Sequence, residues 1–355
     1  MKSIIPAILV ILLLCSGCIK KSGVRSHTPV KIILDTDLGP DYDDVGALTI
    51  LHAMADSGKA EILAILASNK HDMVAPSIEV INTYFGRKTL PIGAPKTEGV
   101  NIASSQHWPD SIVAKYPHTI KSTSEVPDAV EIYRKVLASQ PDNSVTIVTI
   151  GFLTNLSNLL QSQPDSLSSL NGTELVSKKV KRLVSMAGRF PAGKEFNIFK
   201  DSTSSEYVFN EWPGEIIFTG FEIGEKIHTG LRLINSNIKN SPVKDVFSIS
   251  IPLSVEDKNG RMSWDETAVL IAIYGTEGFF ETKRGNIIVN KDGSNGWEDS
   301  SSGKQFYVIQ KMAITEMSKF LEDRMMHQPI RTRCQQPLDT PQLKPILTDN
   351  CLMRA

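Results

Sequence analysis

The sequence predicts an α/β fold, a single domain in which helices flank one mostly parallel sheet. Two observations support this prediction. Short apolar runs typical of buried strands alternate with runs of helical periodicity, and polar residues gather directly after several of the apolar runs. Alternating strands and helices build parallel sheets that are covered on both faces. Because no repeat and no linker-like stretch interrupts residues 29–325, we expect one domain over this range.

The first strand is predicted at 32–34, and a helix over 43–57 follows it. In that helix Val45, Leu48 and Leu51 recur at helical spacing, an aspartate at its start can cap it, and the next glycine ends it. The same patterns predict further strands at 61–67, 91–93, 145–150, 181–186 and 215–219, and further helices at 78–85, 128–139, 155–161, 204–211 and 266–274.

Composition argues against a nucleic acid as partner. The chain of 355 residues is 41% hydrophobic and carries a formal net charge of −1. Binding to a phosphate backbone favours a strongly basic surface, whereas short basic runs such as 178–182 are more typical of solvated helix or strand ends. We therefore expect no nucleic-acid partner.

Residues 1–18 have the pattern of a lipoprotein-type export signal. A lysine follows the first methionine, the apolar run 4–14 is too short to span the hydrocarbon core, and small residues precede Cys18. The stretch 14–18 resembles a bacterial lipobox, with Cys15 where leucine is usual. Cleavage before Cys18 would leave a lipidated cysteine and a polar tether over 19–28, which predicts a periplasmic or cell-surface lipoprotein. The alternative is an ordinary secretory signal.

A C-terminal tail is expected at 326–355. It contains Cys334 and Cys351, and an exported chain permits a disulfide between them, although spacing alone does not establish the pairing. The membrane is expected as a partner only through the lipid anchor. The sequence leaves open whether the chain forms a homo-oligomer.

The stretch 35–44 holds five aspartates in ten residues, directly after the first predicted strand. Open α/β sheets build their sites at the carboxyl ends of their strands. Like charges at this density repel one another unless something neutralises them, and a hard divalent cation does so with carboxylate and carbonyl ligands. Because the stretch contains no Cys or His, Ca²⁺ suits it better than Zn²⁺.

Four blocks of sequence carry a resemblance to a known family. Residues 35–48 closely resemble the aspartate signature of the inosine-uridine-preferring nucleoside hydrolases, usually DTDPGxDDAxAL. Residues 151–155 look like the family's GPLTN, residues 186–201 like its MGG…EFNxxxD, and residues 264–269 like its HDPxAV. The blocks stand in the family's order and cover most of the chain from residue 31 to 274.

The resemblance implies a Rossmann-like nucleoside hydrolase fold and a Ca²⁺-dependent enzyme that splits ribonucleosides into ribose and free base. It assigns the metal to Asp37, Asp44, the main-chain carbonyl of Thr154, and Asp265, and it makes Asp37 the catalytic base. The residues implied to bind the ribose hydroxyls are Asp43, Asn69, Glu195 and Asn197. Such a site suits an oxocarbenium-like transition state, which needs nearby negative charge and a positioned water.

The aspartate stretch departs from the family pattern by two additional residues, Asp41 and Tyr42. Asp41 is a candidate additional ligand or hydroxyl acceptor, and the alternative is a solvated loop acid. Asp35 is also a possible additional site residue, but we favour a buried acid that holds the loop through hydrogen bonds to backbone amides.

A second departure lies on the leaving-group side. Trp264 stands where many family members have the histidine that protonates the departing base, and indole cannot act as a general acid. Trp264 is instead a candidate substrate-binding residue that stacks on a purine. Other donors considered by position are His71, His107 and Tyr42. The family's usual Gly-Asn before Glu195 is absent, and Arg189 or Lys194 could replace its contact to the sugar's hydroxymethyl end.

Two other functions remain as alternatives. The first is a non-catalytic ribose or nucleoside binding lipoprotein that keeps the Ca²⁺ site, a hypothesis that Trp264 supports. The second is a haloacid-dehalogenase-like phosphatase, suggested by Asp35-x-Asp37 after a strand. We disfavour the phosphatase because its pattern expects Thr or Val where Gly39 stands, and because it leaves Asp43-Asp44 unexplained. The hydrolase accounts for the most residues.

Overall fold

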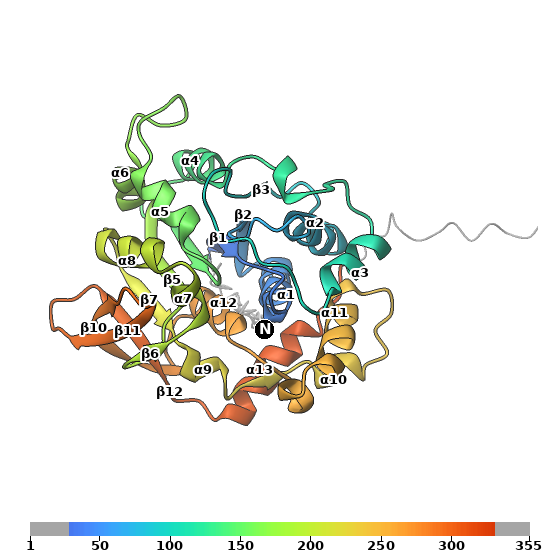
Figure 1. Cartoon of the computed structure of the whole chain (residues 1–355). Helices are drawn as coiled ribbons and strands as arrows, with labels where there is room; N and C mark the ends of the chain where they lie inside the picture. The colour runs from blue at the N-terminus through green and yellow to red at the C-terminus, as the bar shows by residue number, and fades with distance from the viewer. Residues whose placement is uncertain (1–27, 331–355) are drawn as a thin grey trace, which may run out of the picture.

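A mostly parallel sheet is the centre of the computed structural model, which describes residues 28–330 (Figure 1). Within these residues the strands β3-β2-β1-β4-β5-β7-β12 are neighbours in that order and run parallel, and β10, β11 and β6 extend the sheet in antiparallel fashion. The predicted α/β class with a mostly parallel sheet is confirmed. The strands are β1 (Val30–Thr36), β2 (Ala60–Ala67), β3 (Ile92–Gly93), β4 (Val145–Thr149), β5 (Val180–Met186), β6 (Gly193–Lys194), β7 (Ile216–Thr219), β10 (Phe280–Val289), β11 (Ser294–Asp299) and β12 (Gln305–Gln310).

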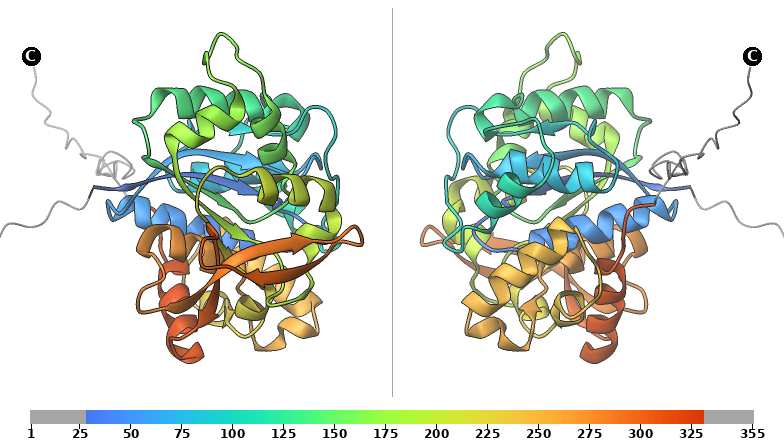
Figure 2. Two further views of the ribbon diagram at one scale, coloured as in Figure 1. Left: turned by 90° about the vertical axis from the view of Figure 1, so that its left-hand side faces the viewer. Right: turned by 90° about the vertical axis from the view of Figure 1, so that its right-hand side faces the viewer.

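Helices cover both faces of the sheet, and each face has its own apolar core (Figure 2). On β1, Ile32 and Leu34 belong to the core beneath one face and Ile33 belongs to the other, because successive strand residues point in opposite directions. One face packs against α1 (Asp43–Asp56), α2 (Val74–Tyr84), α11 (Pro242–Ser250), α12 (Asp265–Tyr274) and α13 (Ile314–Met325), and the other against α4 (Ala129–Ser139), α5 (Thr154–Gln161), α6 (Gly172–Lys179) and α8 (Ser202–Glu211).

Shorter elements lie at the edge where the parallel strands end. They include α7 (Phe196–Lys200), α9 (Phe221–Gly224), the 3₁₀ turns η2 (Ile251–Leu253) and η3 (Glu256–Asn259), and the two-stranded ribbon of β8 (His228–Thr229) and β9 (Arg261–Met262). Farther around the domain are α3 (Trp108–Lys115), α10 (Leu231–Ile234) and η1 (Thr123–Glu125). The sequence prediction missed β10–β12. Most of β10 and β11 is polar, and the apolar run of β12 covers only Phe306–Ile309, so these strands lack the longer apolar run of a buried parallel strand.

Several sequence predictions lie outside the described residues. The signal segment 1–18, most of the tether 19–28, Cys334 and Cys351 belong to this group. The described chain continues past α13, where the His327 imidazole lies 2.6 Å from Asp56 Oδ2 and stacks against Phe85. In the described residues none of the helices combines the length and apolarity needed to cross a membrane.

A buried histidine couples the stability of this fold to pH. His52 of α1 is fully buried, its Nε2 lies 2.9 Å from Asn82 Oδ1, and its ring stacks on Phe85. Burial lowers the pKa of His52 from 6.5 to about 3. Its imidazole is therefore neutral in the folded chain at pH values where the unfolded chain binds a proton.

We expect His52 to lower the free energy of unfolding as the pH falls below 6.5, by about 1.4 kcal/mol per pH unit until the folded-state pKa is approached. His52→Gln should remove this component. Urea titrations at about pH 7.5 and about pH 4.5 measure it as the difference between wild type and variant, because other groups titrate equally in both. Equal pH dependence in the two proteins would contradict the assignment.

Candidate active site

The acidic stretch joins β1 to α1 at the carboxyl edge of the sheet. Asp35 and Thr36 are the last residues of β1, Asp37 begins the loop, and Asp43 and Asp44 form the first turn of α1. The Thr36 hydroxyl donates a hydrogen bond to Asp44 Oδ1 and accepts one from the Leu38 N–H at 3.2 Å. Strand, loop and helix are thus fastened together by one threonine side chain.

Three carboxylates of this region form a candidate metal centre. Oxygen atoms of Asp41, Asp44 and Asp265 lie within 4.8 Å of one another. Asp44 and Asp265 are buried, whereas the Asp41 side chain is 45% exposed. Asp44 Oδ2 is buried and has no hydrogen-bond partner. Burial and the neighbouring negative charges raise the pKa values of Asp44 and Asp265 well above the ordinary value. An oxygen-only donor set with an unsatisfied buried oxygen fits a hard divalent cation.

The other predicted ligands lie beside this group. Asp37 is nearly buried, and its pKa is raised by burial and by the charge of Asp41. It lines the same cavity as Asp265, although the three-carboxylate group is formed with Asp41 in its place. Thr154 begins α5, and its hydroxyl donates to Asp201 Oδ2 at 2.7 Å. This hydrogen bond does not involve the main-chain carbonyl, which is the ligand atom that the family resemblance implies.

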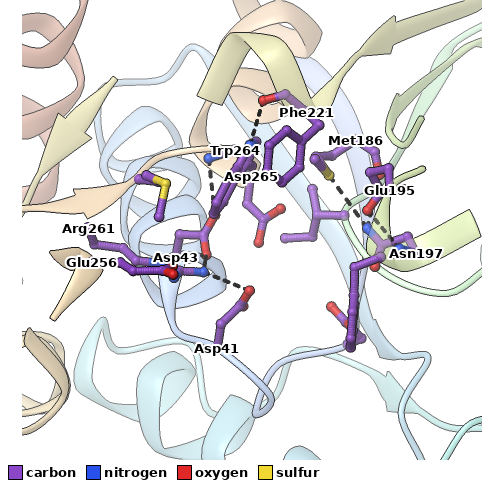
Figure 3. A pocket seen from close by; sticks show the side chains of 14 residues that line it. Asp41, Asp43, Met186, Glu195, Asn197, Phe221, Glu256, Arg261, Trp264 and Asp265 are labelled. Atoms are coloured by element: carbon purple, nitrogen blue, oxygen red, sulfur yellow. Dashed lines mark hydrogen bonds and ion pairs between the residues drawn. The ribbon is translucent and has the colours of Figure 1, made fainter. Parts of the chain in front are cut away.

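A cavity of about 200 Å³ opens beside the carboxylates (Figure 3). It is bounded by the acidic loop, by α7, by α9 and by the segment from η3 to the start of α12. Its lining consists of Asp37, Asp41, Asp43, Ile150, Met186, Glu195, Phe196, Asn197, Phe221, Glu256, Arg261, Met262, Trp264 and Asp265.

Glu195 and Asn197 form one wall of the cavity. Glu195 caps α7 by accepting hydrogen bonds from the Asn197 N–H at 2.7 Å and from two further backbone amides. Burial raises the pKa of Glu195 to about 7, although these hydrogen bonds lower it. Asn197 donates to the Met186 carbonyl at 3.1 Å. The helix α7 begins at Phe196, and its first turn brings both side chains to the cavity.

Asn69 is occupied with holding the loops together. Its amide nitrogen donates to the Asp37 and Ile102 carbonyls at 3.2 and 2.8 Å, and its oxygen accepts from the His71 and Ile102 N–H groups at 3.1 and 3.0 Å. These four bonds use the hydrogen-bonding capacity of the amide. The predicted contact of Asn69 to a substrate hydroxyl therefore has no free donor or acceptor in this geometry.

Asp35 is fully buried on β1 and belongs to a polar network of the core. Tyr133 donates to it at 2.9 Å, and the Asn155 amide lies 3.1 Å from the same oxygen. Burial raises the pKa of Asp35 to about 7, and the hydrogen bonds act in the opposite direction. The expected partners were backbone amides, but the partners are the side chains of α4 and α5.

Arg261 of β9 is a site residue that the sequence prediction missed. Its Nε and Nη2 donate to Asp43 Oδ1 at 3.1 and 2.7 Å, and Nη2 also lies 2.7 Å from Asp41 Oδ2. Burial alone would lower the pKa of Arg261, but Asp43 and Asp41 raise it well above its usual value. In the sequence, the feature that could have indicated this role is a lone arginine four residues before the predicted metal aspartate, in a chain whose predicted site is rich in acids.

Asp43 is held on both sides. While Oδ1 accepts from Arg261, Oδ2 accepts from the backbone N–H groups of Trp264 and Asp265 at 3.1 and 3.3 Å, at the start of α12. A carboxylate offers about four acceptor positions, and here four N–H groups occupy them. The geometry favours a positioning role for Asp43 over the predicted contact with ribose.

Trp264 and Phe221 form an aromatic wall of the cavity. The Trp264 indole N–H donates to the Phe221 carbonyl at 2.8 Å, and the two rings lie 5.0 Å apart. The donor considered at Tyr42 is engaged, because its hydroxyl donates to Asp257 at 2.8 Å. Within the described part of the chain, none of the residues lining the cavity is a histidine, so His71 and His107 lie elsewhere.

The two basic residues considered for the sugar's hydroxymethyl end also have other contacts. Arg189 Nη2 lies 3.0 Å from Glu225 Oε2, and its guanidinium lies over the Phe221 ring. Lys194 lies over the Phe199 ring, with Nζ 4.1 Å from the ring centre. Neither side chain belongs to the lining of the cavity as the described residues form it.

The fold and the site together define an α/β protein with a candidate metal centre in a cavity at the carboxyl edge of its sheet. Comparison with known families is more specific: the family model described as inosine-uridine preferring nucleoside hydrolase matches residues 32–319. The chain belongs to this family, as the four sequence blocks predicted.

Individual relatives are distant. An inosine-uridine preferring nucleoside hydrolase of Leishmania major is 26% identical over 52% of this chain and 58% of its own length. A pyrimidine-specific ribonucleoside hydrolase RihA of Citrobacter koseri is 25% identical over 54% and 60%. The matched region therefore spans somewhat more than half the length of these curated relatives. A plant nucleoside hydrolase structure has a TM-score of 0.64 at 18% identity, over 84% of this chain and 99% of that one, and shows the same fold.

We expect a divalent cation to stabilise the protein, and Asp44→Asn to remove that effect, because the buried unsatisfied Oδ2 is then replaced by an amide. Saturation to a hundredfold excess over the dissociation constant corresponds to about 2.7 kcal/mol. Thermal unfolding with added CaCl₂ or with chelator measures the shift. Glu256→Gln, at the cavity wall but outside the three-carboxylate group, is the matched control and should keep the shift. A full shift in Asp44→Asn would contradict the metal assignment.

Proposed function

We propose that this protein hydrolyses the N-glycosidic bond of ribonucleosides to ribose and free base, with Ca²⁺ as its cofactor. The observation that carries the proposal is a single cavity in which a carboxylate cluster faces a wall formed by Glu195 and Asn197. Membership of the nucleoside hydrolase family supports the reaction class. The relatives' names, which include nucleoside and ribonucleoside hydrolases, support a nucleoside as substrate.

In this proposal the cation is held by Asp44 and Asp265 together with Asp41, and Asp37 lies beside them. The resemblance adds the main-chain carbonyl of Thr154. When bound, Ca²⁺ supplies positive charge that offsets the repulsion of the carboxylates and makes a nearby water more acidic. The chemistry of the donors, which are all oxygens, supports a hard cation such as Ca²⁺.

The chain's own residues then perform the remaining tasks. Asp37, which lines the cavity, accepts a proton from the attacking water. The carboxylates of the cavity stabilise the positive charge that develops on the sugar as the C–N bond breaks. Glu195 and Asn197 grip the ribose hydroxyls from the opposite wall. Asp43, with its acceptor positions occupied, orients the start of α12 and thereby Asp265.

The base is proposed to lie against Trp264 and Phe221. Their rings bound the cavity, and stacking on aromatic rings suits the flat face of a purine. Trp264 supplies no proton, because its only donor is bound to the Phe221 carbonyl. One observation favours the second candidate function, a ribose or nucleoside binding protein: among the described residues, no histidine lines the cavity.

We further propose that the protein is exported and anchored through a lipid at Cys18, with its domain in the periplasm or on the cell surface. This proposal is supported by the signal-like pattern of residues 1–18.

The test is release of reducing sugar from purine and pyrimidine ribosides by the purified protein, with calcium or with chelator. We expect calcium-dependent release, and a loss of about 10²–10⁴-fold in kcat for Asp37→Ala because the catalytic base is removed. Asp265→Ala should also abolish calcium-dependent activity. Glu316→Gln on the far helix α13 is the control and should retain activity.

Riboside binding in calorimetry without any sugar release would replace the hydrolase by the binding protein. Full activity in both Asp37→Ala and Asp265→Ala would contradict the roles given to these aspartates.

A further inference from the structure

The cavity holds one positive charge on the side of its aromatic wall. Of the side chains that line it in the described part of the chain, six are carboxylic acids and Arg261 is the cation. Arg261 comes from β9, which directly precedes the segment that carries Trp264 (Figure 3). Its guanidinium carbon lies 5.1 Å from the centre of the Trp264 ring and 4.9 Å from that of Tyr42.

The guanidinium is held firmly but its donors are not all used. Nε and Nη2 bind Asp43 and Asp41, as described above. Nη1 lies 3.8 Å from Asp257 Oδ1, which is beyond hydrogen-bond distance, and makes no hydrogen bond to the residues that the structure describes. A guanidinium has five N–H donors, and with Nε and Nη2 held by carboxylates the two donors of Nη1 have no acceptor among the described residues.

We propose that Arg261 is a catalytic residue for the leaving group: its guanidinium donates a hydrogen bond to the nucleobase as the base departs. The inference rests on the proposed hydrolysis of nucleosides. It assigns to a fixed cation the task that a proton donor would otherwise perform, in a cavity whose aromatic wall offers no free donor.

The reaction balances without an acid in the protein. The bond between C1′ and the base nitrogen breaks, and its electron pair stays on the nitrogen. Water forms the new C1′–O bond and gives one proton to Asp37. The base leaves with a negative charge that hydrogen bonds from Arg261 stabilise, and it then takes a proton from solvent water. Arg261 keeps its own proton throughout, because guanidinium does not deprotonate in proteins.

A purely structural role for Arg261 is the competing explanation. The same guanidinium bridges Asp41 and Asp43, so its removal would also disturb the carboxylate cluster. Loss of activity alone therefore does not separate the two roles. The structural role and the leaving-group role predict different activities on different substrates. If Arg261 stabilises the leaving group, its removal matters little for a substrate that releases an intrinsically stable anion, whereas a structural defect affects all substrates alike.

The experiment compares two substrates in the full chain with calcium: inosine, and 4-nitrophenyl β-D-ribofuranoside, whose nitrophenolate departs as a stable anion. For Arg261→Gln we expect kcat/KM to fall about 10²–10³-fold on inosine, as for loss of one preorganised donor, and about tenfold or less on the nitrophenyl riboside. Arg261→Lys, which keeps the charge, should recover part of the activity on inosine.

Glu195→Gln is the matched control. Glu195 lines the cavity, and its proposed partner is the ribose that both substrates share, so this variant should lower kcat/KM by a similar factor on both substrates. Retention of the calcium-induced thermal shift verifies that each variant is folded and binds the cation.

Equal losses on both substrates in Arg261→Gln would overturn the inference and leave Arg261 as a positioning residue. Wild-type turnover of the nitrophenyl riboside without turnover of any nucleoside would also overturn it, since no assistance to the base would then exist. Release of neither product by wild type would refute the proposed function itself, and the inference with it.

Discussion

Repulsion among buried carboxylates is the constraint on which this site depends. Asp37, Asp43, Asp44 and Asp265 are all nearly inaccessible to solvent, and burial together with the surrounding negative charges raises the pKa values of Asp37, Asp44 and Asp265. The fold meets part of this repulsion with one guanidinium, two backbone N–H groups at the start of α12, and the Thr36 hydroxyl. Asp44 Oδ2 remains without a partner. The negative charge that these groups do not balance suits a cation from solution.

The parallel sheet explains how residues so distant in sequence come together. β1, β4 and β5 are neighbours, and each delivers polar residues at its carboxyl end: Asp37, Thr154 and, through the following turn, Glu195. The remaining wall comes from outside this pattern, since Arg261 and Trp264 belong to the segment before α12. Strand ends thus provide the acidic side of the cavity and its Glu195 wall, and an irregular segment provides the aromatic side with its cation.

The sequence predicted the parts of the site that follow from local pattern. The apolar run of β1, the aspartates after it and the start of α12 have signatures within a few residues, so Asp37, Asp44 and Asp265 could be named. It could not predict interactions decided by distant packing. Asn69 matched a ribose-binding position, but contacts with residue 102 use both ends of its amide. Arg261 has no motif of its own, and its role exists only because β9 lies against the acidic loop.

The two additional residues of the acidic loop and Arg261 form one structural unit. The Tyr42 hydroxyl binds Asp257, its ring packs against Phe247 of α11, and the Trp108 indole donates to the Asp41 carbonyl at 3.2 Å. These three contacts fix the longer loop from α3, α11 and η3. They turn the Asp41 carboxylate toward both the cluster and Arg261. A longer loop adds a negative charge to a site already rich in acids, and Arg261 balances that charge at the same place. The departure from the family's aspartate signature and the cation beside Trp264 are therefore best understood together: the loop that carries the additional acid also positions the guanidinium at the aromatic wall.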